Sequence, residues 1–113
     1  MKSKRSKATD IPPEVKRAVW DRDDGACVVC GNMVNVMPNA HYIPRSRGGL
    51  GIEENIVTLC TPLTINNCHH KYDNGDKETR ELYKSLIKKY LMSKYPNWDE
   101  SKLYYTKWGQ INE

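Results

Sequence analysis

Cys27-Val28-Val29-Cys30-Gly31 is the stretch that decides the fold of this chain of 113 residues. Two cysteines on one tight turn, with two residues between them, are a typical ligand pair of structural zinc sites. The glycine that follows lets the backbone fold back toward the sulfur atoms. Such a pair needs further ligands elsewhere in the chain to complete a tetrahedral site.

The other two cysteines of the chain, Cys60 and Cys68, would complete the site. They are separated by seven residues, which is wider than the roughly two to four of most zinc sites. The alternatives are a set of reduced thiols or a redox pair. A redox Cys-x-x-Cys motif is expected in a thioredoxin-like βαβ context, which this sequence lacks. We therefore expect a structural zinc ion bound by Cys27, Cys30, Cys60 and Cys68.

Composition indicates one small domain with a limited hydrophobic core. Hydrophobic residues make up 38% of the chain, and phenylalanine is missing. A chain of this size with a thin core often needs a metal, a disulfide or a partner to fold. A reducing cytoplasm, where paired cysteines favour metal over disulfides, is the expected compartment.

The net charge is +4, and basic residues are concentrated in residues 1–10, which we predict to be a flexible basic leader able to attract phosphate. No stretch is apolar enough for a membrane span, and the N-terminus lacks the apolar core of a signal peptide. We expect no membrane association.

Residue patterns further along predict an α+β fold of short elements. Pro12-Pro13 opens a helix, Pro44 ends a strand, Asn74-Gly75 stops a helix and Asp76 caps the next one. The long helix has an apolar stripe (Leu82, Leu86, Ile87, Tyr90, Leu91) that we expect to pack on the core. The predicted elements are a helix 13–21, strands 34–37, 40–43 and 56–59, a helix 68–72, a helix 77–94 and a last short helix containing Trp98, Leu103, Tyr104, Tyr105 and Trp108.

A second group of motifs lies between the cysteines. It consists of His41 followed by Pro44-Arg45-Ser46 and Gly48-Gly49, then Asn55 ahead of Ile-Val-Thr-Leu-Cys60, then Cys68-His69. In this order the motifs resemble the HNH endonuclease family, in its zinc-bound branch with four cysteines. The resemblance spans about residues 11–74.

The resemblance implies a small ββα-metal (His-Me finger) core with a four-cysteine zinc site and flanking helices. It places His41 at the position of the general base, since a neutral imidazole can take a proton from an attacking water. Asn55 matches the residue whose side-chain amide braces the loop carrying the base. His69 matches the last histidine of the motif, a catalytic residue that binds the divalent ion.

Asp73 follows His69 by four residues, so on a helix both side chains lie on one face. The pair can therefore hold one ion from the same side. Nitrogen and oxygen ligands suit Mg²⁺, Mn²⁺, Ni²⁺ or Zn²⁺, and the sequence does not choose among them.

Ala40 departs from the family pattern, in which the residue before the base is commonly an Asp or His that binds the metal. Water could fill the vacant coordination position, or His41 itself could be drawn onto the ion. The second arrangement would remove the general base.

Basic side chains beside this site are candidates for contact with DNA phosphates: Arg45, Arg47, His70 and Lys71. The predicted function is a metal-dependent DNA endonuclease, and the alternative is a catalytically impaired, zinc-stabilised DNA-binding module. The predicted parts are a leader (1–10), a nuclease core with the zinc site (11–75) and a helical extension packed on it (76–113). Family analogy adds a phage, prophage or restriction context in a bacterial or phage-infected cytoplasm, phage packaging proteins as partners, and a monomer or homodimer.

Overall fold

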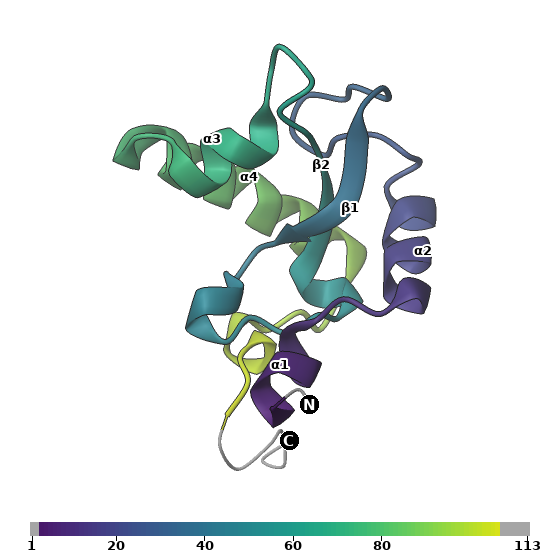
Figure 1. Ribbon diagram of the computed structural model, residues 1–113, viewed down its shortest axis with the longest axis vertical. Coiled ribbons are helices and arrows are strands. Elements are labelled where there is room, and N and C mark those ends of the chain that lie inside the picture. Colours follow the sequence, from purple (N-terminus) through teal and green to yellow (C-terminus); the bar gives the residue numbers. More distant parts are fainter. Residues whose placement is uncertain (1–2, 107–113) are drawn as a thin grey trace.

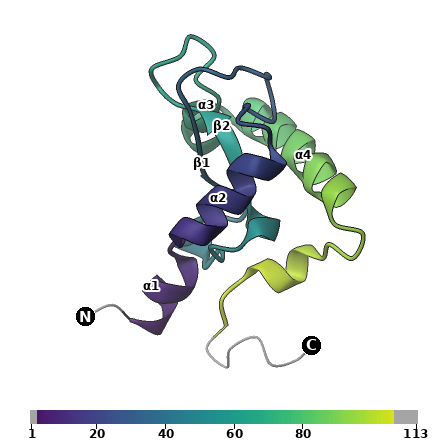
Figure 2. The ribbon, with the colours of Figure 1, turned by 90° about the vertical axis from the view of Figure 1, so that its right-hand side faces the viewer.

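A computed structural model describes residues 3–106 of the chain. It is a small α+β structure with one two-stranded antiparallel sheet. The elements in chain order are α1 (Lys4–Thr9), α2 (Pro13–Arg22), β1 (Val36–His41), β2 (Ile56–Cys60), α3 (Cys68–Asn74) and α4 (Lys77–Lys94), with 3-10 turns η1 (Arg45–Arg47), η2 (Glu53–Asn55) and η3 (Glu100–Leu103). Helix α2 lies on one side of the strands, and α3 and α4 lie on the other (Figures 1 and 2).

The sheet pairs β1 with β2, from Val36 opposite Cys60 to His41 opposite Ile56. We predicted two short strands, 34–37 and 40–43, where the structure has one continuous strand. Pro38 lies inside β1, at a register shift between Met37 and Ala40. A proline lacks the N–H of a regular ladder and is accommodated at such a bulge. The strand therefore continues across a residue that usually interrupts one.

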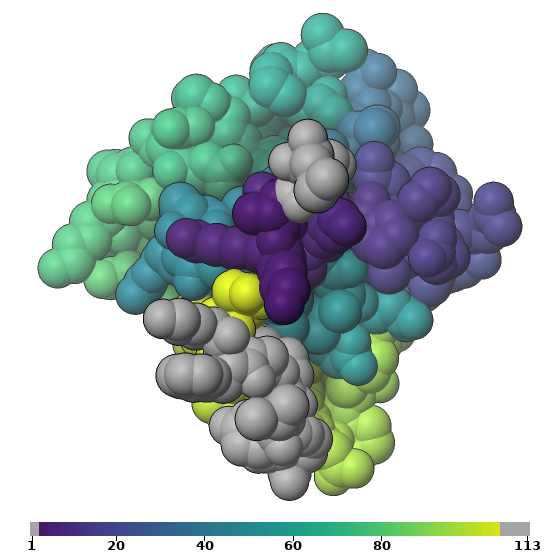
Figure 3. Space-filling view, turned by 60° about the horizontal axis from the view of Figure 1, so that its bottom comes forward, coloured from purple at the N-terminus to yellow at the C-terminus, as the bar shows by residue number. Residues whose placement is uncertain are grey.

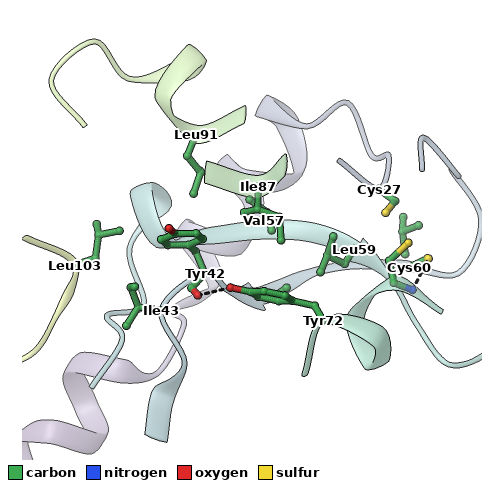
Figure 4. Close-up of a cluster of buried hydrophobic side chains, with 13 residues drawn as sticks. Cys27, Tyr42, Ile43, Val57, Leu59, Cys60, Tyr72, Ile87, Leu91 and Leu103 are labelled. Atoms are coloured by element: carbon green, nitrogen blue, oxygen red, sulfur yellow. Dashed lines mark hydrogen bonds between the residues drawn. The ribbon is translucent and has the colours of Figure 1, made fainter. Parts of the chain in front are cut away.

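Strand β2 is the centre of the core, because every residue from Ile56 to Cys60 is buried. The predicted strand 56–59 is confirmed. Ile87 and Leu91 of α4 pack with Val57 and Leu59, and the cysteines lie at one end of the core, away from Leu103 (Figure 4).

Helix boundaries follow local sequence signals closely. Pro13 stands in the first turn of α2, and the Asp76 side chain accepts a hydrogen bond from the Thr79 N–H at 2.7 Å to cap α4. The helices predicted from Pro12-Pro13 and from Asp76 are confirmed, and the one predicted at 68–72 is α3. The apolar stripe of α4 is only partly buried, however, since Leu82 is 57% and Leu86 40% exposed.

The flexible leader predicted at residues 1–10 does not hold over residues 3–10. Helix α1 packs on the rest of the molecule with Thr9 buried, and Gly51 donates to the Ala8 carbonyl at 3.0 Å. The Arg5 guanidinium donates to the carbonyls of Arg45 at 3.2 Å and Ser46 at 2.9 Å. Figure 3 shows α1, in purple, lying across this face of the molecule.

After α4 the chain returns to the core. The Trp98 ring packs edge-on against Tyr42 with ring centres 5.6 Å apart, and Leu103 is buried. The expected last helix is the short 3-10 turn η3, and Trp108 lies outside the described residues. Up to Thr106, the extension from residue 76 is thus packed on the core. None of the described helices is long and apolar enough to cross a membrane.

Candidate functional site

The four cysteines come together as predicted from their pairing. Their sulfur atoms all lie within 4.8 Å of one another, and those of Cys30 and Cys60 are 3.9 Å apart. A tetrahedral ion with metal–sulfur bonds of about 2.3 Å requires sulfurs about 3.8 Å apart. All four cysteines are free thiols, and none forms a disulfide within the described residues. This cluster could hold a metal such as zinc.

Three separate elements supply the cluster. The turn after Cys27 is closed by hydrogen bonds from Gly31 N–H to the Cys27 carbonyl and from Cys27 N–H to the Asn32 carbonyl, both at 2.8 Å. Gly31 has a φ of 79°, which glycine adopts without strain. Cys60 ends β2 and Cys68 begins α3, and the Cys68 N–H points at the Cys60 sulfur at 3.1 Å. Residues 61–67 loop out between them, which explains the wide spacing.

Electrostatics of the thiols favour a bound cation. Burial raises the pKa values of Cys27 and Cys68. Burial also acts to raise the pKa of Cys30, but the Asn32 backbone and the Asn66 side chain stabilise its thiolate and lower the pKa to about 7. A metal ion would supply the positive charge that buried thiolates need, and its binding releases protons.

A cleft of about 1190 Å³ opens on the α3 side of β1. His41, His69 and Asp73, which we predicted as catalytic and metal-binding residues, all line it. Of all the side chains that line it, six are basic and three, Asp73 included, are acidic. The basic ones are Lys16, Arg45, Arg47, Lys77, Arg80 and Lys84, and the acidic ones are Asp10, Asp73 and Glu81.

His41 stands at the end of β1 with its ring orientation fixed by α1. Its Nε2 lies 2.9 Å from the Thr9 carbonyl oxygen. A carbonyl can only accept, so Nε2 carries the proton, and in the neutral ring Nδ1 is left as an acceptor. Burial lowers the pKa of His41, and the charges of Arg45 and His69 lower it further, against opposing effects of Thr9 and Asp73. The ring is therefore neutral at pH 7.

His69 and Asp73 lie one turn apart on α3, as their spacing predicted. The His69 Nε2 is 3.2 Å from Asp73 Oδ2, and both side chains are partly exposed to the cleft. This pair presents one nitrogen and one oxygen to the same point. Within residues 3–106, the four cysteines form the group of three or more His, Cys, Asp or Glu side chains whose ligand atoms all lie within 4.8 Å of one another. His41 does not form such a group with His69 and Asp73.

Asn55 is fully buried and holds the loop that follows β1. Its side-chain oxygen accepts from the Ile43 N–H at 2.7 Å. Its amide nitrogen donates to the carbonyls of Ile43 at 3.2 Å and Leu50 at 2.8 Å. The side chain thus ties the two ends of the loop 43–50 together, and this loop carries Arg45 and Arg47.

The residues predicted to contact phosphate divide into two groups. Arg45 and Arg47 line the cleft, where Arg45 is also paired with Asp10 at 2.5 Å. His70 and Lys71 are exposed on α3 but are not part of the cleft lining, because helical geometry turns them away from the face of His69 and Asp73. Contact of these four side chains with DNA stays a prediction, in which His70 and Lys71 would act from outside the cleft.

Several cleft residues were not predicted from the sequence. Lys77, Arg80 and Lys84 share one face of α4, and their spacing of three and four residues could have indicated this. Asn39 on β1 also lines the cleft, whereas Ala40 is fully buried in the core. No motif in the sequence distinguished Asn39.

Comparison with known proteins identifies a relative of this chain. The chain is 30% identical over 63 residues to Anaredoxin of Nostoc sp. (strain PCC 7120), which covers 56% of this chain and 76% of that protein. No protein-family model matches the chain, and no solved structure matches it significantly.

Proposed function

The chain belongs to the same protein family as Anaredoxin, and from the residues of its cleft we propose that it is a metal-dependent DNA endonuclease of the HNH type. The observation that carries this proposal is the position of His41. Its protonated Nε2 donates a hydrogen bond to the Thr9 carbonyl, which leaves Nδ1 to act as a base. The same cleft is lined by His69 and Asp73, which could bind an ion.

In the proposed reaction, water is the nucleophile and the P–O3′ bond of the substrate breaks. His41 Nδ1 takes one proton from the water as its oxygen bonds to phosphorus, and the departing 3′-oxygen receives a proton from solvent. The products are a 5′-phosphate and a 3′-hydroxyl. Because the ring is neutral at pH 7, it is ready to accept this proton without prior deprotonation.

His69 and Asp73 fit a divalent ion, since an imidazole nitrogen and a carboxylate oxygen already lie 3.2 Å apart and face the cleft. Such an ion, when bound, would stabilise negative charge on the scissile phosphate and the leaving oxygen. These two residues would hold it in place. Asn55, through its three hydrogen bonds, would hold the loop 43–50 in a fixed position relative to His69 and Asp73.

The charge of the cleft supports a polyanionic substrate. Six basic side chains against three acidic ones leave a cationic surface beside His41. Lysine and arginine that neutralise phosphates supply most of the sequence-independent affinity for DNA. A cleft of about 1190 Å³ has room for a segment of nucleic-acid backbone, and we propose that the phosphates follow Arg47, Arg80 and Lys84.

A supercoiled-plasmid assay tests the proposal. The zinc-loaded protein with Mg²⁺, Mn²⁺ or Ni²⁺ is expected to nick the plasmid, and His41→Ala is expected to abolish nicking while zinc content and circular dichroism stay unchanged. His70→Ala is the matched control, because His70 is a nearby histidine outside the cleft lining. A folded protein that binds DNA but does not cut with any of these ions would instead be a DNA-binding module. Full activity of His41→Ala would refute the assignment of the base.

The relative favours a second candidate, an electron-transfer protein. Anaredoxin carries the name of a redox protein, and four thiolates can hold iron as well as zinc. Metal analysis and visible absorption of protein grown with both metals would separate the two. Iron with reversible reduction would support electron transfer, and colourless protein with one zinc ion per chain would leave the endonuclease as the better proposal.

A further inference from the structure

Within the part of the chain that the structure describes, the side-chain oxygen of Asn39 has no hydrogen-bond partner. The side-chain oxygen Oδ1 is one of three buried polar side-chain atoms that lack a partner among the described residues. Asn39 lies on β1, two positions before His41, and both side chains line the cleft. A buried acceptor without a partner is unfavourable unless a donor or a cation occupies the space beside it.

Strand alternation accounts for the direction of this side chain, because Asn39 and His41 are two residues apart on β1. The register shift between Met37 and Ala40 places Pro38 and Asn39 opposite one residue of β2. Bulges are frequent beside active sites. Across the shift the alternation continues, since Pro38 and Ala40 are buried whereas Asn39 and His41 are partly exposed.

Two other residues that line the same cleft as Asn39 are suited to a cation. His69 and Asp73 supply one nitrogen and one carboxylate oxygen, and the amide oxygen of asparagine is a regular ligand of hard divalent ions. Ala40 cannot contribute, because its side chain is a methyl group that is fully buried in the core. His41 has its Nε2 bonded to Thr9.

We propose that Asn39 Oδ1 is the third protein ligand of the divalent ion held by His69 and Asp73, in place of the acidic or histidine side chain that position 40 lacks. This inference rests on the proposed function only in assuming that an ion binds there. It leaves His41 free to act as the base. It also gives the site one carboxylate and two neutral ligands, so its affinity for an ion is modest until a DNA phosphate adds charge.

Titration with Mn²⁺ followed by electron paramagnetic resonance tests the assignment on the zinc-loaded full chain. Mn²⁺ prefers oxygen and nitrogen ligands and does not compete for the thiolates. Asn39→Ala is expected to weaken Mn²⁺ binding about tenfold or more, the loss expected for one contact to a charged partner. Asn39→Asp is expected to strengthen binding, because it keeps the oxygen and adds a negative charge.

Asn97→Ala and Asn97→Asp are the matched controls, since Asn97 is exposed and lines a different cavity. They make the same changes of size and charge and are expected to leave Mn²⁺ affinity unchanged. Circular dichroism and zinc content identify any variant that fails to fold, and Asn39→Asp, which preserves shape, then decides the question.

The outcomes separate this inference from the endonuclease proposal. If the parent cuts plasmid but Asn39→Ala binds Mn²⁺ as tightly as the parent does, or Asn39→Asp gains nothing, the ligand assignment is overturned and a water fills the space. If the parent does not bind Mn²⁺, the assignment is likewise overturned. If Asn39→Ala loses Mn²⁺ affinity and Asn39→Asp gains it, the ligand is established even in a protein that does not cut.

Discussion

Asn55→Ala removes the side chain that ties together the ends of the loop 43–50, and its cost can be worked out from the structure. Three hydrogen bonds disappear, and they leave the Ile43 N–H, the Ile43 carbonyl and the Leu50 carbonyl without these partners in a buried place. Each buried group left unpaired costs about 1–3 kcal/mol, so the expected loss for three groups is about 3–9 kcal/mol. Native proteins have a free energy of unfolding of about 5–15 kcal/mol, and this substitution is expected to remove a large part of it.

The assay is urea unfolding followed by circular dichroism at a fixed excess of zinc. Asn55→Asp extends the test, because a carboxylate keeps the acceptor for the Ile43 N–H but points its second oxygen at two carbonyl oxygens. It is expected to be at least as destabilising as alanine at pH 7. Asn97→Ala is the control at an exposed asparagine. A loss below about 1 kcal/mol for Asn55→Ala, close to the effect of a surface change, would refute the reasoning.

Further tests concern the core at Ala40, helix α1, the His41 ring and the cysteine cluster. Ala40→Asp is expected to destabilise the protein by about 3 kcal/mol or more in urea, since it puts an unpaired charge in the core; a stable variant with higher Mn²⁺ affinity would contradict this. Arg5→Ala is expected to slow plasmid nicking and weaken the preference for protonated Nε2 in ¹⁵N NMR of His41, because it loosens α1; an unchanged ring spectrum would count against it. Burial lowers the pKa of His41, so as the pH is reduced from 7 the nicking rate is expected to stay constant past about pH 6.5 and to fall only when the pH reaches the lowered pKa. A nicking rate that already falls above about pH 6.5 would contradict this. Chelation of the metal in the four-cysteine cluster is expected to abolish the cooperative thermal transition seen by circular dichroism, and an unchanged transition would show that the metal is dispensable.

Local signals predicted the elements that depend on local physics. Pro13 and Asp76 indicate the starts of helices, and the β-branched residues before Cys60 indicate a strand. These signals are reliable because the contacts that start each element lie within a few residues. The packing of α1 depends instead on Arg5 reaching carbonyls about 40 residues away in sequence, which no window of residues reveals.

Long-range contacts also explain why part of the core could not be read from the sequence. Asp23, the residue after α2, is buried and accepts from the Arg22 guanidinium at 2.7 Å, the Thr58 N–H at 2.9 Å and the Tyr90 hydroxyl at 2.5 Å. This network joins α2, β2 and α4. A buried carboxylate of this kind requires partners from several elements, and the sequence shows each partner only as an ordinary polar residue.

The candidate site was predictable where one element carries the geometry. The shared face of His69 and Asp73 follows from the four-residue spacing of a helix, and the same geometry places His70 and Lys71 off that face. Asn39 was missed because the predicted strands, 34–37 and 40–43, left it between them, whereas β1 runs through it and places it on the same face as His41. The departure at Ala40 was visible in the sequence, but the residue able to compensate for it was not.

The thiolate cluster and the cleft are physically connected through α3. This helix has only seven residues, and its N-cap Asn67 makes no side-chain capping bond, so α3 would not be stable or oriented by itself. Two contacts orient it: Cys68 at its start joins the cysteine cluster, and the Tyr72 hydroxyl donates to the Tyr42 carbonyl at 2.7 Å. His69 follows Cys68 directly and Asp73 follows Tyr72 directly, so each of the two donors is adjacent to an anchored residue. A metal bound by the four sulfurs would therefore fix where the oxygen and nitrogen donors lie relative to His41, and we expect a change in the cysteine cluster to alter the geometry of the cleft first.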